Sequence, residues 1–249
     1  MAKLADSLRK SIMKISIVIP AHNEEKYIGA CLSSILNEGL GAFEEIIVVN
    51  NLSTDGTANI VKKFDGVLLI SETQKGPNKA RQRGLEKASG DLVAYIDADT
   101  EVNKEWFASV EKEFAKNPDL VCLSGPLFYN GLTSAENAMV WIYWHCLAIP
   151  TYFLFGYMAT GGNCVVRRDA FLKIGGFDTD VKFYGDDTNT ARRLSKIGKV
   201  KFKTSFFVLT SSRRFKGQGF FKTGFLYASN FLSEVFFHRP VTKEYRDIR

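Results

Sequence analysis

The stretch Asp91-Leu-Val-Ala-Tyr-Ile-Asp97-Ala-Asp99 is a short apolar run that ends in two carboxylates. The run lacks helical periodicity, so it predicts a buried strand of a parallel sheet. Ligands of an open α/β sheet bind beyond the carboxyl ends of the strands, so both carboxylates should face a crevice. Because residues two apart in an extended chain share a face, Asp97 and Asp99 could reach one divalent cation, or a ribose and a cation. A strand end followed by a helix cap would look the same, so the context has to decide.

Strands and helices alternate before this stretch. Earlier apolar runs predict three strands, at Ile15–Pro20, Glu45–Asn50 and Val67–Ser71. Helices are expected between the strands, around Ile28–Ile35, Thr57–Phe64 and within Gly76–Gly90. This alternation predicts right-handed βαβ crossovers and a mainly parallel sheet of the mononucleotide-binding type, with residues 14 to 101 as the nucleotide half.

The second half of the chain is less regular. A helix over Lys104–Lys116, a strand over Leu120–Ser124 and mixed strand over Val200–Leu209 are expected. Gly161–Asp178 predicts a glycine loop, a strand, a short helix and a turn, and Gly185-Asp186-Asp187 begins the next helix. Acidic residues suit the first turn of a helix, so helix capping is the structural interpretation of Asp186 and Asp187.

Composition places the chain among globular proteins. Its 249 residues are 45% hydrophobic and 24% charged, which fits one domain with a long insertion. The net charge of +6 favours anionic partners, but no basic stripe interleaved with stacking aromatics indicates nucleic-acid binding. The four cysteines are dispersed, which predicts reduced core residues in a cytosolic protein and neither disulfides nor a zinc site.

Two aromatic segments suggest contact with lipid. Met139–Met158 contains no Asp, Glu, Lys or Arg and is just long enough to cross a bilayer. Pro150, His145 and the strands expected on both sides argue against crossing, so an interfacial helix pair and an ordinary buried insertion remain as alternatives. The stripe along Phe220–Phe237 is typical of a docking helix.

The N-terminal residues lack the apolar core of a signal peptide, so secretion is not expected. Leu4, Leu8 and Ile12 fall on one helical face among basic residues. A basic helix on a membrane surface and a frayed terminal extension both fit this pattern.

Four stretches in a fixed order give the chain a family resemblance. They are Ile17-Val-Ile-Pro-Ala-His-Asn-Glu-Glu25, Asn50-Asn-Leu-Ser-Thr-Asp-Gly-Thr57, Asp97-Ala-Asp99, and Gly175-Gly-Phe-Asp178 followed by Gly185-Asp-Asp187. Together they closely resemble the family 2 glycosyltransferases of GT-A fold, over roughly residues 14 to 215. The resemblance implies one α/β domain over residues 1–249, with a mainly parallel central sheet flanked by helices. Its parts would be a nucleotide-sugar half (14–101), an acceptor half (102–215) and a C-terminal aromatic docking segment (216–249).

The resemblance also implies a function. Such an enzyme moves one sugar from a nucleoside diphosphate sugar, here UDP or GDP, to an acceptor with inversion at the anomeric carbon. Mn²⁺ or Mg²⁺ would bind Asp99, with Asp97 as a second candidate ligand, and Asp187 would be the general base. The remaining residues implied for the donor are Pro20, Ala21, Glu24, Asn51, Arg81, Ala98, Arg213 and Arg214, and those for the acceptor side are Gly161, Gly162 and Asp186. A surface charge is the alternative interpretation of Arg81, and surface decoration is the competing interpretation of Arg213 and Arg214.

The chain departs from the family pattern at two positions. Asn51 stands where an aspartate is usual, and Asp186 stands where a glutamate is usual. The QxxRW sequence of processive synthases is missing, which favours a single transfer. With the aromatic segments, this predicts cell-envelope glycan or glycolipid synthesis on a lipid-linked acceptor at the cytoplasmic membrane face. A sugar-nucleotide nucleotidyltransferase and a noncatalytic nucleotide-sugar binder are the alternatives.

Overall fold

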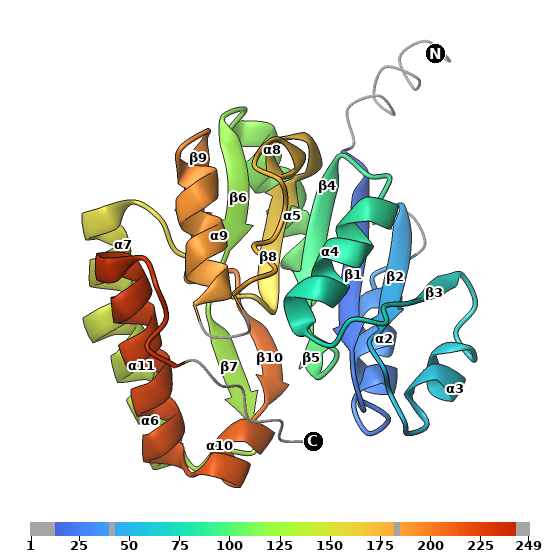
Figure 1. Cartoon of the computed structure of the whole chain (residues 1–249), viewed down its shortest axis with the longest axis horizontal. Helices are drawn as coiled ribbons and strands as arrows, with labels where there is room; N and C mark the ends of the chain where they lie inside the picture. The colour runs from blue at the N-terminus through green and yellow to red at the C-terminus, as the bar shows by residue number, and fades with distance from the viewer. Residues whose placement is uncertain (1–12, 40–42, 182–184, 243–249) are drawn as a thin grey trace.

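The computed structural model describes residues 13–39, 43–181 and 185–242. Within these ranges a seven-stranded sheet, in the order β3-β2-β1-β4-β8-β6-β9, lies between two layers of helices (Figure 1). The strands of this sheet are β1 Ile15–Ala21, β2 Glu45–Asn50, β3 Val67–Ser71, β4 Leu92–Ile96, β6 Leu120–Ser124, β8 Asn163–Arg167 and β9 Lys199–Phe202. The helices are α2 Ile28–Leu36, α3 Thr57–Val61, α4 Pro77–Lys87, α5 Trp106–Lys116, α6 Ser134–Ile142, the π-helical η1 Tyr143–Ala148, α7 Ile149–Phe155, α8 Arg168–Lys173, α9 Asp186–Ser195, α10 Arg213–Gln218 and α11 Phe220–Phe237.

The first four strands of the chain are parallel, as the sequence predicts. Val18 of β1 pairs with Ile47 of β2 on one side and with Tyr95 of β4 on the other. All four strands therefore end at the same edge of the sheet. The loops that follow them carry Asn51 and Asp97 to that edge.

The other half of the sheet is mixed. β8 pairs antiparallel with both β4 and β6, whereas β9 pairs parallel with β6. β8 begins beside the ends of β4 and β6, where Asn163 pairs with Ile96 and Cys164 with Ser124, so it runs in the reverse direction. The predicted α/β fold with a mainly parallel sheet is thus confirmed, with one reversed strand.

A small three-stranded sheet joins the two halves at the carboxyl edge. Its order is β5-β10-β7, with β5 Thr100–Glu101, β7 Leu127–Asn130 and β10 Val208–Ser211. β10 is antiparallel to β5, and the Ser211 N–H donates to the Asp99 carbonyl at 3.2 Å. This pairing brings the start of α10 next to the Asp97-Ala-Asp99 loop.

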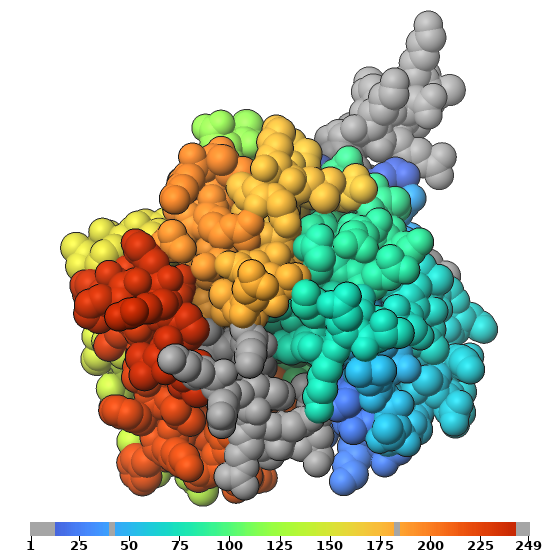
Figure 2. Space-filling model, viewed as in Figure 1, coloured from blue at the N-terminus to red at the C-terminus, as the bar shows by residue number. Residues whose placement is uncertain are grey.

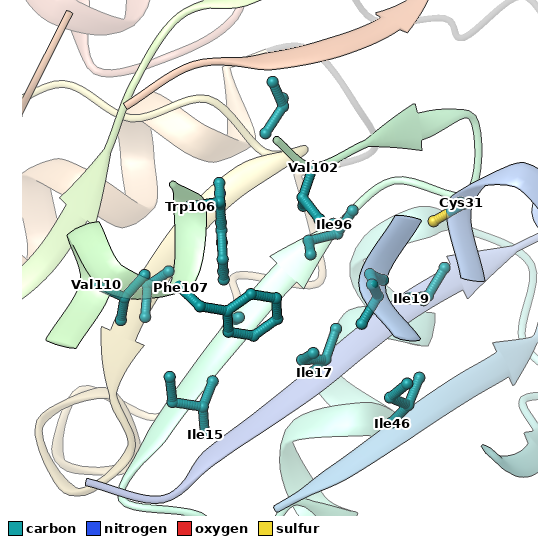
Figure 3. Packing of buried hydrophobic residues seen from close by; sticks show 14 of the residues in the cluster. Ile15, Ile17, Ile19, Cys31, Ile46, Ile96, Val102, Trp106, Phe107 and Val110 are labelled. Atoms are coloured by element: carbon teal, nitrogen blue, oxygen red, sulfur yellow. The ribbon is translucent and has the colours of Figure 1, made fainter. Parts of the chain in front are cut away.

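Two apolar cores hold the helices against the large sheet. One face buries Ile17, Ile46 and Ile96 against α2 and α5, with Trp106 and Phe107 from α5 among the packed rings (Figure 3). The opposite face packs against α4, α8 and α9. A third cluster, which includes Trp144, Phe202 and Phe231, joins α11 to the helix that starts at Ser134.

The aromatic insertion differs from the predicted helix pair. α6, η1 and α7 form one continuous helix over Ser134–Phe155, which lies beside α11 at one edge of the molecule (Figure 1). Pro150 fits because it lies in the first turn of α7, directly after the π-helical segment, where the register of backbone hydrogen bonds changes. Of the described helices, this one alone is long and apolar enough to cross a membrane, and 17% of its most apolar window is buried.

Three smaller expectations also need correction. The expected Val200–Leu209 strand is two strands, β9 and β10, which belong to different sheets. Regular helix in α3 ends at Val61, because the next turn tightens into a Phe64 N–H bond to the Val61 carbonyl. Cys146 is exposed, whereas the other cysteines are buried and all four are free. The predicted N-terminal helix face lies outside the described residues.

Candidate active site

A cavity of about 780 Å³ opens at the carboxyl edge of β1, β2 and β4. Loops after parallel strands form such crevices in open α/β sheets. Every donor-side residue singled out in the sequence lines it: Pro20, Ala21, Glu24, Asn51, Arg81, Asp97, Ala98, Asp99, Arg213 and Arg214. The structure therefore brings together residues that lie up to 194 positions apart in the chain, from Pro20 to Arg214.

Arg213 connects the first-strand loop to Asp99. Its guanidinium donates to both Glu24 carboxylate oxygens at 2.7 and 2.6 Å and lies 3.0 Å from Asp99 Oδ2. The same guanidinium lies over the Tyr27 ring, 4.8 Å from its centroid. Burial raises the pKa of Asp99, and the charge of Arg213 opposes that shift. Arg213 is thus held inside the cavity by hydrogen bonds and is not a surface charge.

Arg81 connects the two acidic motifs. Its side chain is 6% exposed, with Nη2 2.7 Å from Asp97 Oδ1 and Nη1 2.9 Å from Asp186 Oδ2. The helix start at Asp186 thereby faces the end of β4. Burial raises the pKa of Asp186 to about 7, although the positive charge of Arg81 opposes the shift. The surface interpretation of Arg81 is wrong.

Asn51 holds the loop that leads into α4. Its side-chain amide donates to the Glu72 and Gln74 carbonyls at 3.0 and 2.8 Å, and its Oδ1 accepts from the Gly76 N–H at 2.8 Å. An aspartate could not make the two donations, which gives the departure at this position a structural role. Because both amide hydrogens are engaged, Oδ1 is the side-chain atom of Asn51 that is left to contact a nucleotide base.

A second cavity, of about 180 Å³, contains Asp187. Asp186, Gly161 and Gly162 also line it, and it shares Arg81 and Asp97 with the larger cavity. A Cβ on Gly162 would lie 2.6 Å from Asp97 Oδ2, so only glycine lets the backbone pass this carboxylate. The predicted acceptor-side residues are thus gathered at a cavity that adjoins the predicted donor site.

Asp187 is half-buried at the start of α9. Its Oδ1 accepts from the Thr188 N–H at 2.7 Å. Burial raises the pKa of Asp187, while the hydrogen bonds from the Thr188 and Gly161 N–H groups lower it. A carboxylate whose pKa lies above the usual range is better matched to accepting a proton near neutral pH.

The donor set at Asp99 and Asp97 suits a hard divalent cation. Each carboxylate has one oxygen bound to an arginine, Asp97 Oδ1 to Arg81 and Asp99 Oδ2 to Arg213. The described residues contain no group of three His, Cys, Asp or Glu side chains placed to hold a metal. Mg²⁺ is commonly held by one or two carboxylates together with substrate phosphates, so the pair fits an ion that a bound diphosphate would complete.

Two tyrosines at the site were not anticipated from the sequence. Tyr129 and Tyr227 line both cavities. Tyr129 lies on β7, a strand that the sequence analysis does not predict. Tyr227 lies in the aromatic stripe of α11. No local signal marks either residue, because the pairing of β7 with β10 brings Tyr129 to the site and the packing of α11 brings Tyr227 there.

The comparison with known families agrees with this geometry. The family model described as glycosyl transferase family 2 matches residues 16–175. The chain belongs to this family.

Family 2 relatives match different lengths of the chain. Poly(ribitol-phosphate) β-N-acetylglucosaminyltransferase TarS of Staphylococcus aureus is 37% identical over 100 residues, which are 38% of this chain and 18% of TarS. Glucosyl-dolichyl phosphate glucuronosyltransferase of Haloferax volcanii is 26% identical over 184 residues, 70% of this chain and 59% of that protein. Among the curated relatives compared, the chain spans between 15% and 59% of their length.

Solved structures confirm the fold. The mannosyltransferase of Pyrobaculum calidifontis, determined with GDP-Man and Mn²⁺, superposes with a TM-score of 0.71 at 22% identity. The match covers 91% of this chain and 64% of the mannosyltransferase. The GT-A fold expected from the sequence is thereby established.

Proposed function

We propose that this family 2 chain transfers one sugar from a nucleoside diphosphate sugar to an acceptor, with inversion at the anomeric carbon. The observation that supports this most is that the two cavities meet at Arg81 and Asp97. A donor in the larger cavity would have its sugar near the carboxylate of Asp187 in the smaller one. GDP and UDP sugars are the first candidates, since solved relatives hold GDP-Man and UDP-GlcNAc.

The proposed reaction is a direct displacement. Asp187 accepts the proton of the acceptor hydroxyl as its oxygen bonds to the anomeric carbon. The bond from that carbon to the diphosphate oxygen breaks, and its electron pair leaves with the nucleoside diphosphate. The base has to lie on the face opposite the leaving group, and Asp187 belongs to a different element from Asp97 and Asp99.

The leaving diphosphate needs positive charge around it. Arg213 and Arg214 line the donor cavity, and guanidinium groups suit phosphate oxygens. Glu24 holds Arg213 through both oxygens, so Arg213 can leave Asp99 and stay anchored. A Mn²⁺ or Mg²⁺ ion on Asp99, with Asp97 as a second candidate ligand, would act as a Lewis acid toward the developing negative charge.

A lipid-linked acceptor at a membrane surface fits the outer edge of the molecule. Phe153 and Leu154 of α7 are 79% and 75% exposed, on a helix without charged residues after Glu136. Large exposed apolar patches mark binding surfaces. The acceptor would carry a hydroxyl or a phosphate at the end of a hydrocarbon chain, and the enzyme would attach peripherally.

A panel of UDP, GDP and dTDP sugars tests the donor part of the proposal. With Mn²⁺, at least one should raise the melting temperature of the protein and be slowly hydrolysed, and EDTA should remove both effects. Asp99→Ala should lose the metal-dependent effects but unfold cooperatively, because it removes a cavity-wall carboxylate and no core volume. If no member binds, or if Asp99→Ala in EDTA keeps full activity, the proposed function is wrong.

A further inference from the structure

An apolar groove of about 230 Å³ lies between the long helix and the C-terminal helices. One wall comes from α6 and η1, and the other from α10 and α11. It is lined by Tyr129, Met139, Val140, Tyr143, Trp144, Phe215, Phe220, Phe221, Gly224, Phe225 and Tyr227. None of these side chains carries a formal charge at neutral pH, so the groove suits an apolar ligand.

The groove adjoins the acceptor-side cavity. Tyr143 and Trp144 line both of them. Tyr129 and Tyr227 line the groove, the acceptor-side cavity and the donor-side cavity. These shared side chains place the inner end of the groove beside the cavity that contains Asp187.

The outer end of the groove has the character of a membrane-facing surface. Phe221 and Phe225 are 75% and 74% exposed at its rim, and α11 forms part of the outer surface at this edge (Figure 2). Lys216 and Lys222 are exposed on the same segment, and residues 215–233 contain no acidic residue. Exposed aromatics among basic residues favour an anionic lipid surface.

We propose that this groove binds the hydrocarbon chain of a lipid-linked acceptor, while the head group of the acceptor occupies the cavity at Asp187. The inference rests on the proposed transfer reaction, to which it adds the site for the chain. A water-soluble acceptor would leave an uncharged, aromatic-walled path to the acceptor-side cavity without a use. The position of the groove beside that cavity, together with its exposed aromatic rim, selects a lipid chain as the occupant.

Gly224 offers a way to fill the groove without disturbing the helix. A Cβ at this mid-helix position meets nothing within 4 Å. Gly224→Leu should therefore occupy the groove, whereas Gly224→Ala gives the same gain in helix propensity and leaves the groove open. The two variants form a matched pair.

The probe is decyl phosphate below its micellar concentration, compared with inorganic phosphate. Wild type and Gly224→Ala should bind decyl phosphate with dissociation constants within a factor of two of each other. Gly224→Leu should bind it at least tenfold more weakly, and inorganic phosphate should not show this difference. If the dissociation constants for decyl phosphate and inorganic phosphate stand in the same ratio in all three proteins, the proposal is overturned.

Quenching by 10-bromodecyl phosphate locates the chain. Trp144 lines the groove, whereas Trp141 is 53% exposed on the outside of the helix. The bromine should quench Trp141→Phe, which retains Trp144, and should have little effect on Trp144→Phe. Quenching that persists only in Trp144→Phe would mean that the chain adheres to the outer surface, and the groove would be rejected.

Nucleotide-sugar binding of Gly224→Leu separates this inference from the proposed function. The variant should show the same Mn²⁺-dependent thermal shift with nucleotide sugars as wild type. If no nucleotide sugar stabilises either protein but decyl phosphate still discriminates the variants, the transferase proposal fails and the groove stands. If nucleotide sugars bind and decyl phosphate does not discriminate, the groove fails alone.

Discussion

At the scale of single residues, Arg81 has the most consequential position. One guanidinium satisfies Asp97, at the end of β4, and Asp186, at the start of α9. Removing one partner of a buried ion pair leaves an uncompensated charge, which is far more costly than losing a surface pair. The ionic connection between Asp97 on the donor side and Asp186 on the acceptor side therefore depends on this side chain.

Replacing Arg81 should destabilise the protein. We expect Arg81→Met to lower the free energy of unfolding by about 3 kcal/mol, mainly because Asp186 stays buried without its partner. Arg83→Met is the control, because Arg83 lies on the same helix in an exposed pair with Glu86 and should cost less than about 0.5 kcal/mol. Urea denaturation measures both, and equal effects would contradict the buried role.

The pH dependence of turnover should report Asp187. Its base form is lost as the pH falls through its pKa, which burial raises above the ordinary 3.8. kcat/KM should therefore decline on the acid side at a higher pH than the ordinary pKa of an aspartate would give. Asp186→Asn removes a neighbouring negative charge and should move this decline to lower pH. A decline only at or below the ordinary pKa of an aspartate would show that no such group acts as the base.

At the scale of elements, the close approach of α4 to β1 decides whether Arg81 reaches the donor cavity. Gly84 faces β1, and a Cβ there would lie 2.2 Å from Val18 Cγ1. The helix has to approach the sheet this closely for Arg81, one turn earlier, to reach Asp97. Glycine at this position is therefore a packing requirement, despite its low helix propensity.

Two glycine substitutions separate packing from propensity. Gly84→Ala should lower stability by about 1–3 kcal/mol, because the added methyl overpacks the contact with Val18. Gly224→Ala, in the open middle of α11, should instead raise stability by about 0.5–1 kcal/mol. Thermal unfolding of the two variants measures the difference, and a stabilising Gly84→Ala would show that α4 packs less closely than described.

Elements near the motifs were predictable, whereas contacts between distant elements were not. Hydrophobic runs predicted β1 to β4, and motif order predicted the residues around the donor cavity, because both signals are local in sequence. The direction of β8 and the burial of Arg81 depend on long-range pairing, so residue patterns could not supply them. The π-helical segment was missed for a related reason, since nothing in Tyr143–Ala148 departs from an ordinary apolar helix.

At the scale of the whole molecule, the aromatic helices are well separated from the edge strand of the large sheet. α7 and α11 lie at one side of the molecule, and β3 lies at the other (Figure 1). The lipid surface that we propose would lie on the side of α7 and α11, away from β3.

Flotation with phosphatidylglycerol-containing vesicles tests the proposed lipid surface. At low salt the wild-type protein should float with the vesicles, and the double change Phe153→Ser and Leu154→Ser should leave more of it at the bottom of the gradient. Leu68→Ser is the control, because Leu68 is an exposed apolar residue on β3. If wild type stays at the bottom, a soluble acceptor becomes the better hypothesis.

The most direct test of the account is the separation of donor binding from transfer in Asp187→Asn. Asparagine keeps the shape of the side chain but cannot accept the proton. The account predicts unchanged Mn²⁺-dependent binding of the nucleotide sugar and a loss of kcat of roughly a hundredfold or more. Asp178→Asn, outside both cavities, should keep its rate. Near wild-type transfer by Asp187→Asn, with loss in Asp178→Asn or Asp186→Asn, would show that the base is a different residue.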